Sequence, residues 1–279
     1  MKILSGKRAA LKILNNLEVN IRKLPAAPGL AVLLIGDDKP SHLYARLKQE
    51  AAKKIGVRFY LVKFKENAAE RKIIEKISVL NKNGKINGII VQLPLPSKFN
   101  ARRIIKAIDP EKDVDGFHPE NMKLFLKSKE RFWPVFPRAI VKLIEESRLK
   151  LLGKKAVVLA NSQSFGKIMV AALGKKKIRA KYILFKKVKE NVKLIKKADI
   201  IVVAMGIPNL VKGKMIKEGA VVVDGGITKR GKKVLGDVDR ESVKYVASYL
   251  SPVPGGVGPV TVACLFWNVY LATKEQLKD

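Results

Sequence analysis

Short apolar runs alternate with stretches of helical periodicity along most of the chain. In the first half we predict strands at 29–37 (GLAVLLIGD), 58–64 (RFYLVKF) and 88–94 (GIIVQLP). Apolar positions with helical spacing fill the intervals, which predicts helices at 41–55, 67–82 and 97–108. Strands that alternate with helices in this way are typical of βαβ units and of a mainly parallel sheet.

The second half repeats the same alternation. A helix near 138–148 leads into predicted strands at 156–160, 181–185, 199–205 and 220–226, with a further helix from about Ser164. The sequence therefore predicts an α/β protein of two units, the second Rossmann-like. A strongly apolar tail, GPVTVACLFWNVYLATKEQL, predicts one long helix that packs back across the first unit.

The stretch from Pro110 to Pro137 breaks the alternation. It contains DPEKDVDGFHPEN and FWPVFP, which are rich in Pro, Asp and Gly, so turns direct the chain there. We place the passage between domains in this stretch. The predicted first domain is 1–136 plus 254–279, and the second is 137–253.

Length and composition agree with two folded domains. The chain has 279 residues, of which 47% are hydrophobic, and this is enough for two cores. No run approaches 18 apolar residues, and MKILSGKRAA lacks the apolar segment of a signal peptide. A single cysteine, Cys264, cannot form an internal disulfide, which agrees with a reducing compartment. We therefore expect a cytoplasmic protein that does not bind membranes.

A formal net charge of +33 first suggests binding to polyanions. The lysines, however, are scattered through segments such as KKIGV, KNGKING, GKKKIRAKY and TKRGKK, and are not interleaved with aromatic residues. This distribution favours a lysine-rich solvated surface without specific recognition of nucleic acid. A nonenzymatic polyanion-binding protein is the alternative from a different functional class.

Two candidate polar sites lie in the first half. Tyr44 and Lys48 are four residues apart and so share one helical face, although a plain amphipathic surface helix gives the same spacing. Gln92 ends a buried strand just before Pro94 and Pro96. Ligands of α/β proteins bind at the carboxyl ends of parallel strands, so this amide is a candidate to hold a lysine amine or a polar ring edge. A simple strand end is the other interpretation.

A third candidate is the pair Asp113 and Asp115, followed by Gly116. A calcium loop would continue with more oxygen ligands at regular spacing, and none follow. His118 is one of only two histidines, so no zinc cluster is expected, and we predict no metal site. The alternative is that one carboxylate accepts hydrogen bonds from a ligand edge with two donors, such as an amino-pyrimidinone.

Taken together, LYARLK, GIIVQLPLP, PEKDVDGFHPEN and LSPVPGGVGPVTVA resemble the bifunctional methylenetetrahydrofolate dehydrogenase/methenyltetrahydrofolate cyclohydrolase family, the FolD type. The resemblance runs from about Gly29 to Tyr270, with further agreement in ADIIVVAMGIPNLVKG, GAVVVDGGI and GDVD. It implies two α/β domains flanking a cleft, with folate on the first and NADP on the second, usually in a homodimer.

The implied reactions are those of one-carbon metabolism. 5,10-Methylenetetrahydrofolate is oxidised with NADP⁺ to the methenyl form, which is hydrolysed to 10-formyltetrahydrofolate. By resemblance, Lys48 is the catalytic lysine, Tyr44 its positioning partner, Gln92 the amide that holds the lysine, and Asp115 the carboxylate that recognises the pterin. A lysine whose pKa is lowered in a cleft suits the hydrolytic step, because that step needs proton transfer.

The resemblance also implies binding residues beyond these four. Catalytic and substrate-binding positions together are Tyr44, Lys48, Gln92, Leu93, Pro94, Asp115, Pro254, Gly255 and Gly256. The glycines would let the backbone pass close to the flat folate. The predicted cofactor-binding positions are Asn161, Ser162, Gly166, Lys186, Lys187, Ala204, Gly206, Ile227 and Thr261; at Asn161, Lys186 and Lys187 the position follows the family and the residue type does not.

The chain departs from the family at the nucleotide turn. LANSQSFGK has Ala160 and Asn161 where the family has Gly and Arg, whereas Ser162 and Gly166 keep their places. Loss of an arginine contact to the 2′-phosphate would weaken binding by roughly 1.5–3 kcal/mol. This leaves open an enzyme that keeps the cyclohydrolase step with weak or lost dehydrogenase activity.

Two further departures concern the next strand end and the passage between domains. KKVK at 186–189 replaces the family's His-Ser-x-Thr pattern, and after this strand no acidic residue occurs before Glu190, which favours NADP over NAD. The alternative is that Lys186 and Lys187 belong to the general excess of lysine. Phe136 stands where the family usually has Thr, and we expect it to alter the wall of the cleft.

Overall fold

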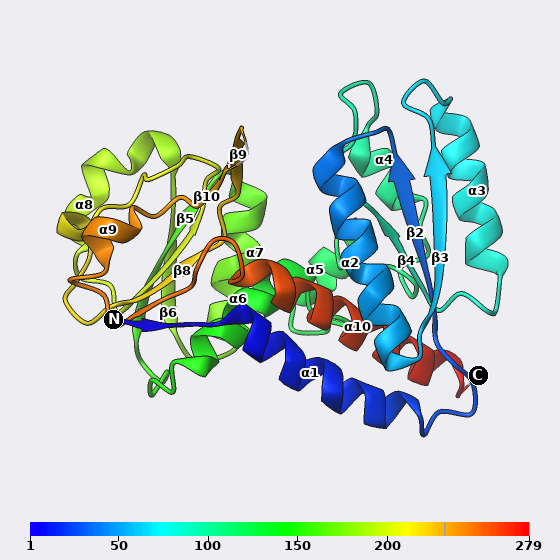
Figure 1. Cartoon of the computed structure of the whole chain (residues 1–279), viewed down its shortest axis with the longest axis horizontal. Helices are drawn as coiled ribbons and strands as arrows, with labels where there is room; N and C mark the ends of the chain where they lie inside the picture. The colour runs from blue at the N-terminus through cyan, green and yellow to red at the C-terminus, as the bar shows by residue number, and fades with distance from the viewer. Residues whose placement is uncertain (232, 279) are drawn as a thin grey trace. The chain divides into compact units, whose positions relative to one another are not determined.

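The structure is a computed structural model that describes residues 1–231 and 233–278. The chain forms two compact units (Figure 1). Unit 1 comprises residues 1–10 and 136–261, and unit 2 comprises 11–135 together with the chain from 262 onward. Compared with the division predicted above, unit 1 also contains the N-terminus and residues 254–261. The reason is a contact between distant parts of the chain, because the N-terminal strand pairs with residues 249–250 and the Gly6 amide donates to the Gly255 carbonyl oxygen.

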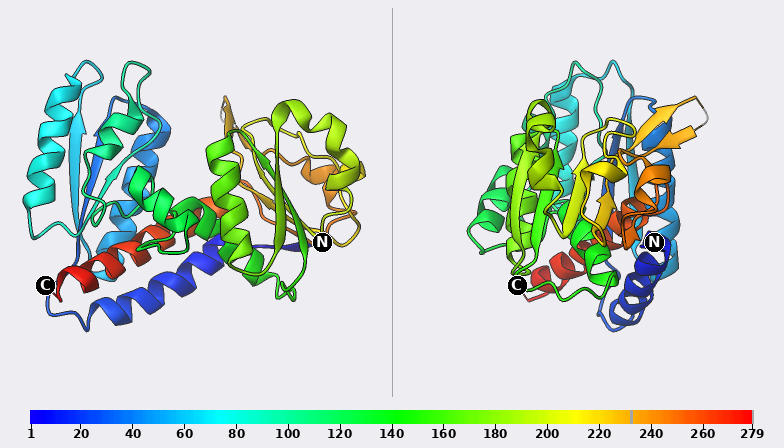
Figure 2. Two further views of the ribbon diagram at one scale, coloured as in Figure 1. Left: turned by 180° about the vertical axis from the view of Figure 1, so that it is seen from behind. Right: turned by 90° about the vertical axis from the view of Figure 1, so that its left-hand side faces the viewer.

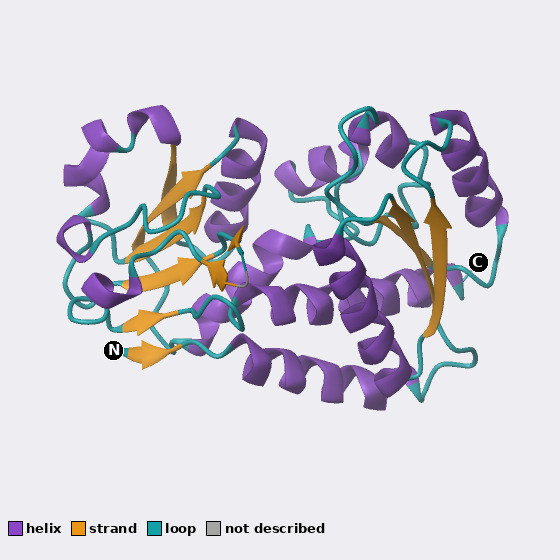
Figure 3. Cartoon of the chain, turned by 45° about the horizontal axis from the view of Figure 1, so that its top comes forward, coloured by secondary structure: helices purple, strands orange, loops and turns teal. Residues whose placement is uncertain are grey.

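Unit 1 is built on a parallel sheet of six strands in the order β1-β11-β8-β7-β5-β6. The strands are β1 (Lys2–Ile3), β5 (Lys155–Ala160), β6 (Arg179–Leu184), β7 (Ile200–Ala204), β8 (Val221–Asp224) and β11 (Tyr249–Leu250). Figure 3 shows their arrows pointing the same way. The four strands predicted in the second half are confirmed, each within a few residues.

Helices cover both faces of this sheet. On one side lie α6 (Val135–Glu146) and α7 (Gln163–Gly174), and on the other lie α8 (Val192–Ile195) and α9 (Arg240–Val243) (Figure 1). Strands β7 and β8 are buried along their whole length, which explains their unbroken Val and Ile runs. The connections include the short 3₁₀ turns η1 (Phe185–Lys187), η2 (Lys189–Asn191) and η3 (Gly213–Met215), and a hairpin of β9 (Thr228–Arg230) and β10 (Lys233–Leu235).

Unit 2 contains a parallel sheet of three strands in the order β3-β2-β4. Its strands are β2 (Gly29–Ile35), β3 (Arg58–Phe64) and β4 (Gly88–Val91), and its helices are α2 (Lys39–Ile55), α3 (Glu70–Lys82), α4 (Ala101–Lys106) and α5 (Pro119–Leu126). Helices α3 and α4 pack on one face through Ile73, Ile77 and Ile104. Figure 2 shows the same unit from behind. The predicted α/β class and parallel sheets are confirmed.

Two long helices complete the fold. Helix α10 (Val257–Gln276) matches the predicted tail helix, and from Val262 onward it belongs to unit 2. There the Asn268 side chain donates hydrogen bonds to the carbonyl oxygens of Val114 and Trp133, at 2.8 and 2.9 Å. Helix α1 (Gly6–Ile21) and the two-residue β1 were not predicted. Among the described residues no helix is both long and apolar enough to cross a membrane.

Candidate active site

Lys48 and Gln92 meet in unit 2. The Lys48 ammonium nitrogen donates a hydrogen bond to Gln92 Oε1 at 2.6 Å. Gln92 is nearly buried, and its amide nitrogen donates to the Leu93 carbonyl oxygen at 2.8 Å. This second bond orients the amide, so that its oxygen faces the lysine. The start of α2 is held by Asp38, whose carboxylate accepts from the Ser41 amide at 2.9 Å. Helix α2 and the end of β4 thus bring the two side chains together.

Asp115 lies within electrostatic reach of Lys48. Burial raises the pKa of Asp115 to about 7, the charge of Lys48 opposes this, and the charge of Asp113 adds to it. Burial also lowers the pKa of Lys48, while the Asp115 charge raises it. The pKa of Tyr44, on the same helix, is raised by burial. A carboxyl with a pKa of about 7 exchanges protons near neutrality, and a lowered pKa increases the neutral fraction of the lysine amine.

Asp113 is a buried support for the turn that carries Asp115. Its carboxylate accepts from the His118 amide at 2.7 Å and from the Asn121 side chain at 3.0 Å. Gly116 adopts a φ of 77°, and a β-carbon there would lie 2.8 Å from the Pro134 backbone. Spacing alone did not distinguish the two aspartates, and the resemblance to the family selected Asp115; in the structure Asp113 is the one bonded to the His118 amide and the Asn121 side chain. No group of three His, Cys, Asp or Glu side chains placed to hold a metal ion occurs among the described residues.

In unit 1 the nucleotide turn connects β5 to α7. The Ser162 hydroxyl caps α7 by accepting from the Phe165 amide at 3.3 Å. Gly166 packs on the Tyr182 ring of β6, where a β-carbon would lie only 2.6 Å from ring atoms. The Asn161 amide donates to the Ala204 carbonyl oxygen at 3.1 Å. Free amides at the start of a helix of 12 residues form a positive end that suits a phosphate, so this turn fits a nucleotide.

The other predicted cofactor positions also lie in unit 1. Lys186 and Lys187 are exposed in η1, directly after β6, and Ile227 is exposed after β8. Gly206 follows β7 with a φ of 72° and has open space where a β-carbon would be. The Thr261 hydroxyl donates to the Gly258 carbonyl oxygen at 2.6 Å, within α10. Most of these residues therefore lie near the carboxyl ends of the parallel strands, where α/β proteins bind ligands.

Comparison with known proteins decides the family. The profile "Tetrahydrofolate dehydrogenase/cyclohydrolase, catalytic domain" matches residues 4–115, and "Tetrahydrofolate dehydrogenase/cyclohydrolase, NAD(P)-binding domain" matches residues 134–277. The chain belongs to the tetrahydrofolate dehydrogenase/cyclohydrolase family. The resemblance seen in the sequence motifs is thereby confirmed, and nothing in the comparisons favours a nonenzymatic polyanion-binding protein.

Relatives of the family match along the whole chain. The bifunctional protein FolD of Nitratiruptor sp. is 41% identical over 285 residues and is covered completely, as is this chain. The structure of bifunctional FolD from Campylobacter jejuni matches with a TM-score of 0.93 and 35% identity, over 99% of each chain. FolD from Trypanosoma brucei, solved with NADP cofactor and an inhibitor, matches with a TM-score of 0.92 and 29% identity, over 99% of this chain and 98% of that one.

Two buried carboxylates in this family member were not among the predicted site residues. Asp224 accepts from the amides of Gly226, Asp237 and Val238, at 2.9, 3.1 and 2.9 Å. Asp237 Oδ2 accepts from the amides of Met205 and Gly206, at 2.6 and 3.0 Å. The two side chains thus tie the loop after β7 to the loops after β8 and β10. Burial raises the pKa of Asp224 to about 6 against these hydrogen bonds, and the charge of Asp237 raises it further.

The glycines beside these aspartates explain two of the family motifs. A β-carbon on Gly226 would lie 2.0 Å from the Asp237 carboxyl carbon, and one on Gly236 would lie 2.1 Å from Asp224 Oδ2. Each carboxylate therefore occupies space that the glycine of the other segment leaves free. GAVVVDGGI and GDVD were matched to the family only as motifs. The sequence did contain a signal for this packing, because each motif places an Asp next to a Gly, and a carboxylate that packs this closely needs a residue without a side chain opposite it.

The proline-glycine tract packs against the start of α1. Gly255 has a φ of 99°, and its carbonyl oxygen accepts from the Gly6 amide at 2.9 Å. A β-carbon on Gly256 would lie 2.4 Å from the Pro252 carbonyl oxygen. These contacts supply a packing reason for both glycines, and their contact with folate stays a prediction. Pro254, between them and Val253, is exposed.

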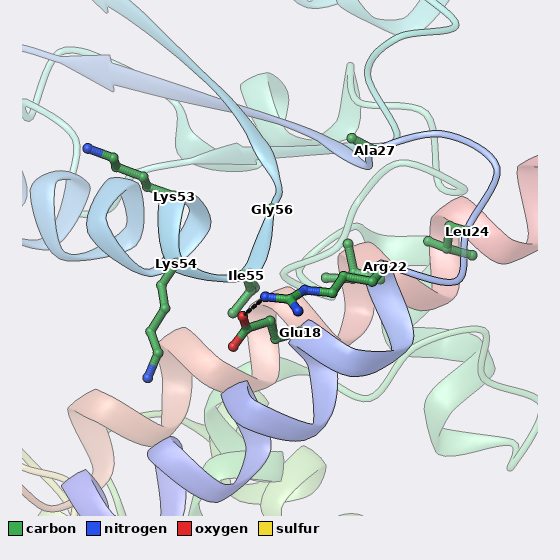
Figure 4. Close-up of a pocket in the computed structure, with 9 residues that line it drawn as sticks. Glu18, Arg22, Leu24, Ala27, Lys53, Lys54, Ile55 and Gly56 are labelled. Atoms are coloured by element: carbon green, nitrogen blue, oxygen red, sulfur yellow. Dashed lines mark hydrogen bonds and ion pairs between the residues drawn. The ribbon is translucent and has the colours of Figure 1, made fainter.

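A hollow of about 430 Å³ lies elsewhere in unit 2, between the ends of α1 and α2. Figure 4 shows that the amines of Lys53 and Lys54 point away from each other, and that Arg22 is paired with Glu18. The labelled basic side chains of this hollow therefore do not point toward a common position where an anion could bind. The hollow does not include Lys48, Gln92 or Asp115, so the candidate catalytic group lies outside it.

Proposed function

We propose that this chain oxidises 5,10-methylenetetrahydrofolate with NADP⁺ and hydrolyses the product to 10-formyltetrahydrofolate, with the chemistry on Lys48, Tyr44, Gln92 and Asp115. The hydrogen bond of 2.6 Å between Lys48 and Gln92 beside Asp115 carries this proposal. In domain terms, unit 2 binds the folate and unit 1 binds the dinucleotide. Membership of the family supports both activities.

The folate is held first by Asp115. The amino-pyrimidinone edge of the pterin presents two N–H donors, and a carboxylate accepts two such bonds in parallel. Leu93 and Pro94 follow Gln92 at the end of β4 and would contact the same ligand. NADP⁺, when bound, would supply the acceptor for the hydride that leaves the methylene carbon. The role of this chain in that step is to align the two rings, because hydride transfer needs no acid or base.

Hydrolysis depends on Lys48. Water attacks the methenyl carbon, and the neutral Lys48 amine accepts a proton from the water as the new C–O bond forms. The resulting ammonium then donates that proton to the ring nitrogen as the C–N bond breaks. The hydroxyl of the intermediate releases its own proton to solvent as its oxygen becomes the formyl C=O, which leaves the formyl group on the other nitrogen. Burial, which lowers the pKa of Lys48, increases the fraction of neutral amine. The Gln92 oxygen holds the ammonium form in place, and the Tyr44 hydroxyl lines the same helical face.

The nucleotide-binding residues favour NADP over NAD. Lys186 and Lys187 lie directly after β6, where a ribose-binding carboxylate would select NAD. The first acidic residue on this turn is Glu190. Asn161, neutral and exposed, stands in place of the expected arginine, and this observation favours the second candidate, a cyclohydrolase with feeble dehydrogenase activity.

One experiment separates the two candidates. Purified protein is given methylenetetrahydrofolate with NADP⁺ or NAD⁺, and both methenyl formation and its hydrolysis are followed. The main proposal expects methenyl formation with NADP⁺ and less with NAD⁺. Hydrolysis of added methenyltetrahydrofolate without methenyl formation from either cofactor would select the second candidate. Loss of both activities would refute the proposed function.

We further propose a homodimer located in the cytoplasm. The resemblance to the family supports the dimer, and the single cysteine supports a reducing compartment. Light scattering of the purified chain measures the mass, and a monomer of 31.0 kDa would refute the dimer.

A further inference from the structure

Phe136 lies over the carboxyl end of the sheet in unit 1. Its ring centroid is 5.4 Å from that of Phe165, with the two ring planes tilted by 41°. On another side the ring touches Gly225, the residue directly after β8. A β-carbon on Gly225 would lie 2.9 Å from Phe136 Cζ, so the ring needs a glycine there. Phe136 and Phe165 are both half-buried.

The strand order assigns this position to one half of a bound dinucleotide. From β5 the chain passes to β6 on one side, and then to β7 and β8 on the other. The turn after β5 lies at this change of direction, which is where doubly wound sheets bind the pyrophosphate. The residues after β6 contact the adenosine ribose, so the other half of the ligand lies toward β7 and β8. Gly225 follows β8, and the Phe136 ring therefore lies on the nicotinamide side.

We propose that Phe136, backed by Phe165, forms the wall against which the nicotinamide ring lies. The inference rests on the proposed binding of NADP to unit 1. A flat aromatic ring and a flat pyridine ring bury apolar surface together, and such contacts contribute beyond the buried area alone. The residue that departs from the family at position 136 thus becomes part of the cofactor site.

The wall and the phosphate turn form one piece of structure. Phe165 stands in the first turn of α7, and its amide donates to the Ser162 hydroxyl that caps the helix. The same turn offers its free amides to the pyrophosphate. Phosphate contact and ring contact are therefore positioned by the same few residues. The two rings thus add apolar contact with the dinucleotide beside the turn in which Asn161 stands in place of arginine.

The test measures binding of two probes to the full chain by calorimetry. NADP⁺ carries the nicotinamide, and adenosine 2′,5′-bisphosphate carries only the adenosine half. We expect Phe136→Thr to weaken NADP⁺ binding about two- to tenfold and to leave the bisphosphate unchanged. Phe136→Leu keeps most of the apolar volume and is expected to lose less. Tyr245→Thr is the control, because this residue is 81% exposed and lies beyond the end of α9.

Three outcomes would overturn the proposal. Phe136→Thr and Phe136→Leu with parental affinity for NADP⁺ would show that the ring makes no contact with the ligand. Tighter NADP⁺ binding by Phe136→Thr would show that the ring occupies the space of the nicotinamide. Equal weakening of both probes would place the effect in the phosphate turn. A parent chain that binds neither probe refutes the proposed function itself, and so is distinguishable from failure of the wall alone.

Discussion

Replacement of Asp237 by alanine tests whether one buried carboxylate shapes the loop after β7. The carboxylate accepts from the Met205 amide at 2.6 Å and from the Gly206 amide at 3.0 Å. Met205 is buried, so its amide loses its partner completely, at a cost of about 1–3 kcal/mol. Gly206 is exposed, and water replaces part of its bond. The negative charge of Asp237 also repels Asp224 and raises the pKa of Asp224, so its removal offsets part of this loss. We expect the free energy of unfolding to fall by about 2–3 kcal/mol in Asp237→Ala.

Asp237→Asn is the matched variant. Both hydrogen bonds go to Oδ2, and an asparagine oxygen in that place keeps them, so the loss is expected to be about half as large. Glu241→Ala removes only a surface ion pair with Lys244 and should stay within about 0.5 kcal/mol of the parent.

The assay combines urea unfolding with hydrogen exchange at residues 205–206 and steady-state kinetics. We expect faster exchange at these amides and a raised KM for NADP⁺ in Asp237→Ala, with hydrolysis of methenyltetrahydrofolate retained because Lys48 lies in the other unit. The reasoning is refuted if Asp237→Ala unfolds like the parent, or if Asp237→Asn is as damaging as Asp237→Ala.

Further predictions concern Lys48, Asp115 and Asn161. Lys48→Ala should abolish hydrolysis of methenyltetrahydrofolate, with Lys53→Ala as a control on the same helix; parental turnover in the first variant would contradict the role of the amine. Because the pKa of Asp115 is about 7, we expect the KM for methylenetetrahydrofolate to rise as the pH falls below 7, and a pH-independent KM in Asp115→Asn. The raised pKa also affects stability. The contribution of this carboxyl to the free energy of unfolding is fully present below the unfolded pKa of 3.8 and is lost as the pH rises through 7. In urea unfolding, Asp115→Asn should therefore exceed the parent in free energy of unfolding by about 2–3 kcal/mol more at pH 8 than at pH 5. Equal gains at both pH values would count against the buried carboxyl. Asn161→Arg should tighten NADP⁺ binding about tenfold or more and leave NAD⁺ unchanged, since only NADP⁺ carries the 2′-phosphate; calorimetry with both nucleotides checks this.

Several strands were predictable because they are buried on both faces. Strands β2, β7 and β8 are continuous apolar runs, and such runs stand out in any sequence. Strand β1 was not predictable, since two residues have no period to detect. Its strand character depends on pairing with β11, which lies far away along the chain. The limits of unit 1 follow from the same long-range contact.

The candidate site divides in the same way. Sequence spacing placed Tyr44 and Lys48 on one face of a helix and Gln92 at a strand end, because helical period and strand position are local properties. That the lysine reaches the amide at 2.6 Å depends on how α2 packs beside β4. The lowered pKa of Lys48 and the raised pKa of Asp115 likewise come from burial, which no local pattern specifies.

The sequence by itself determined the fold class, the family and the residue types of the site, because apolar period and unusual motifs such as VQLPLP and PVPGGVGP are properties of neighbouring residues. Only the tertiary structure decided that Asp224 packs on Gly236, that Asp237 packs on Gly226, and that the Phe136 ring packs on Gly225. These contacts join segments that lie far apart in the chain. The energies of these contacts depend on interatomic distance and on burial in the folded chain. A pattern of neighbouring residues specifies neither of these quantities.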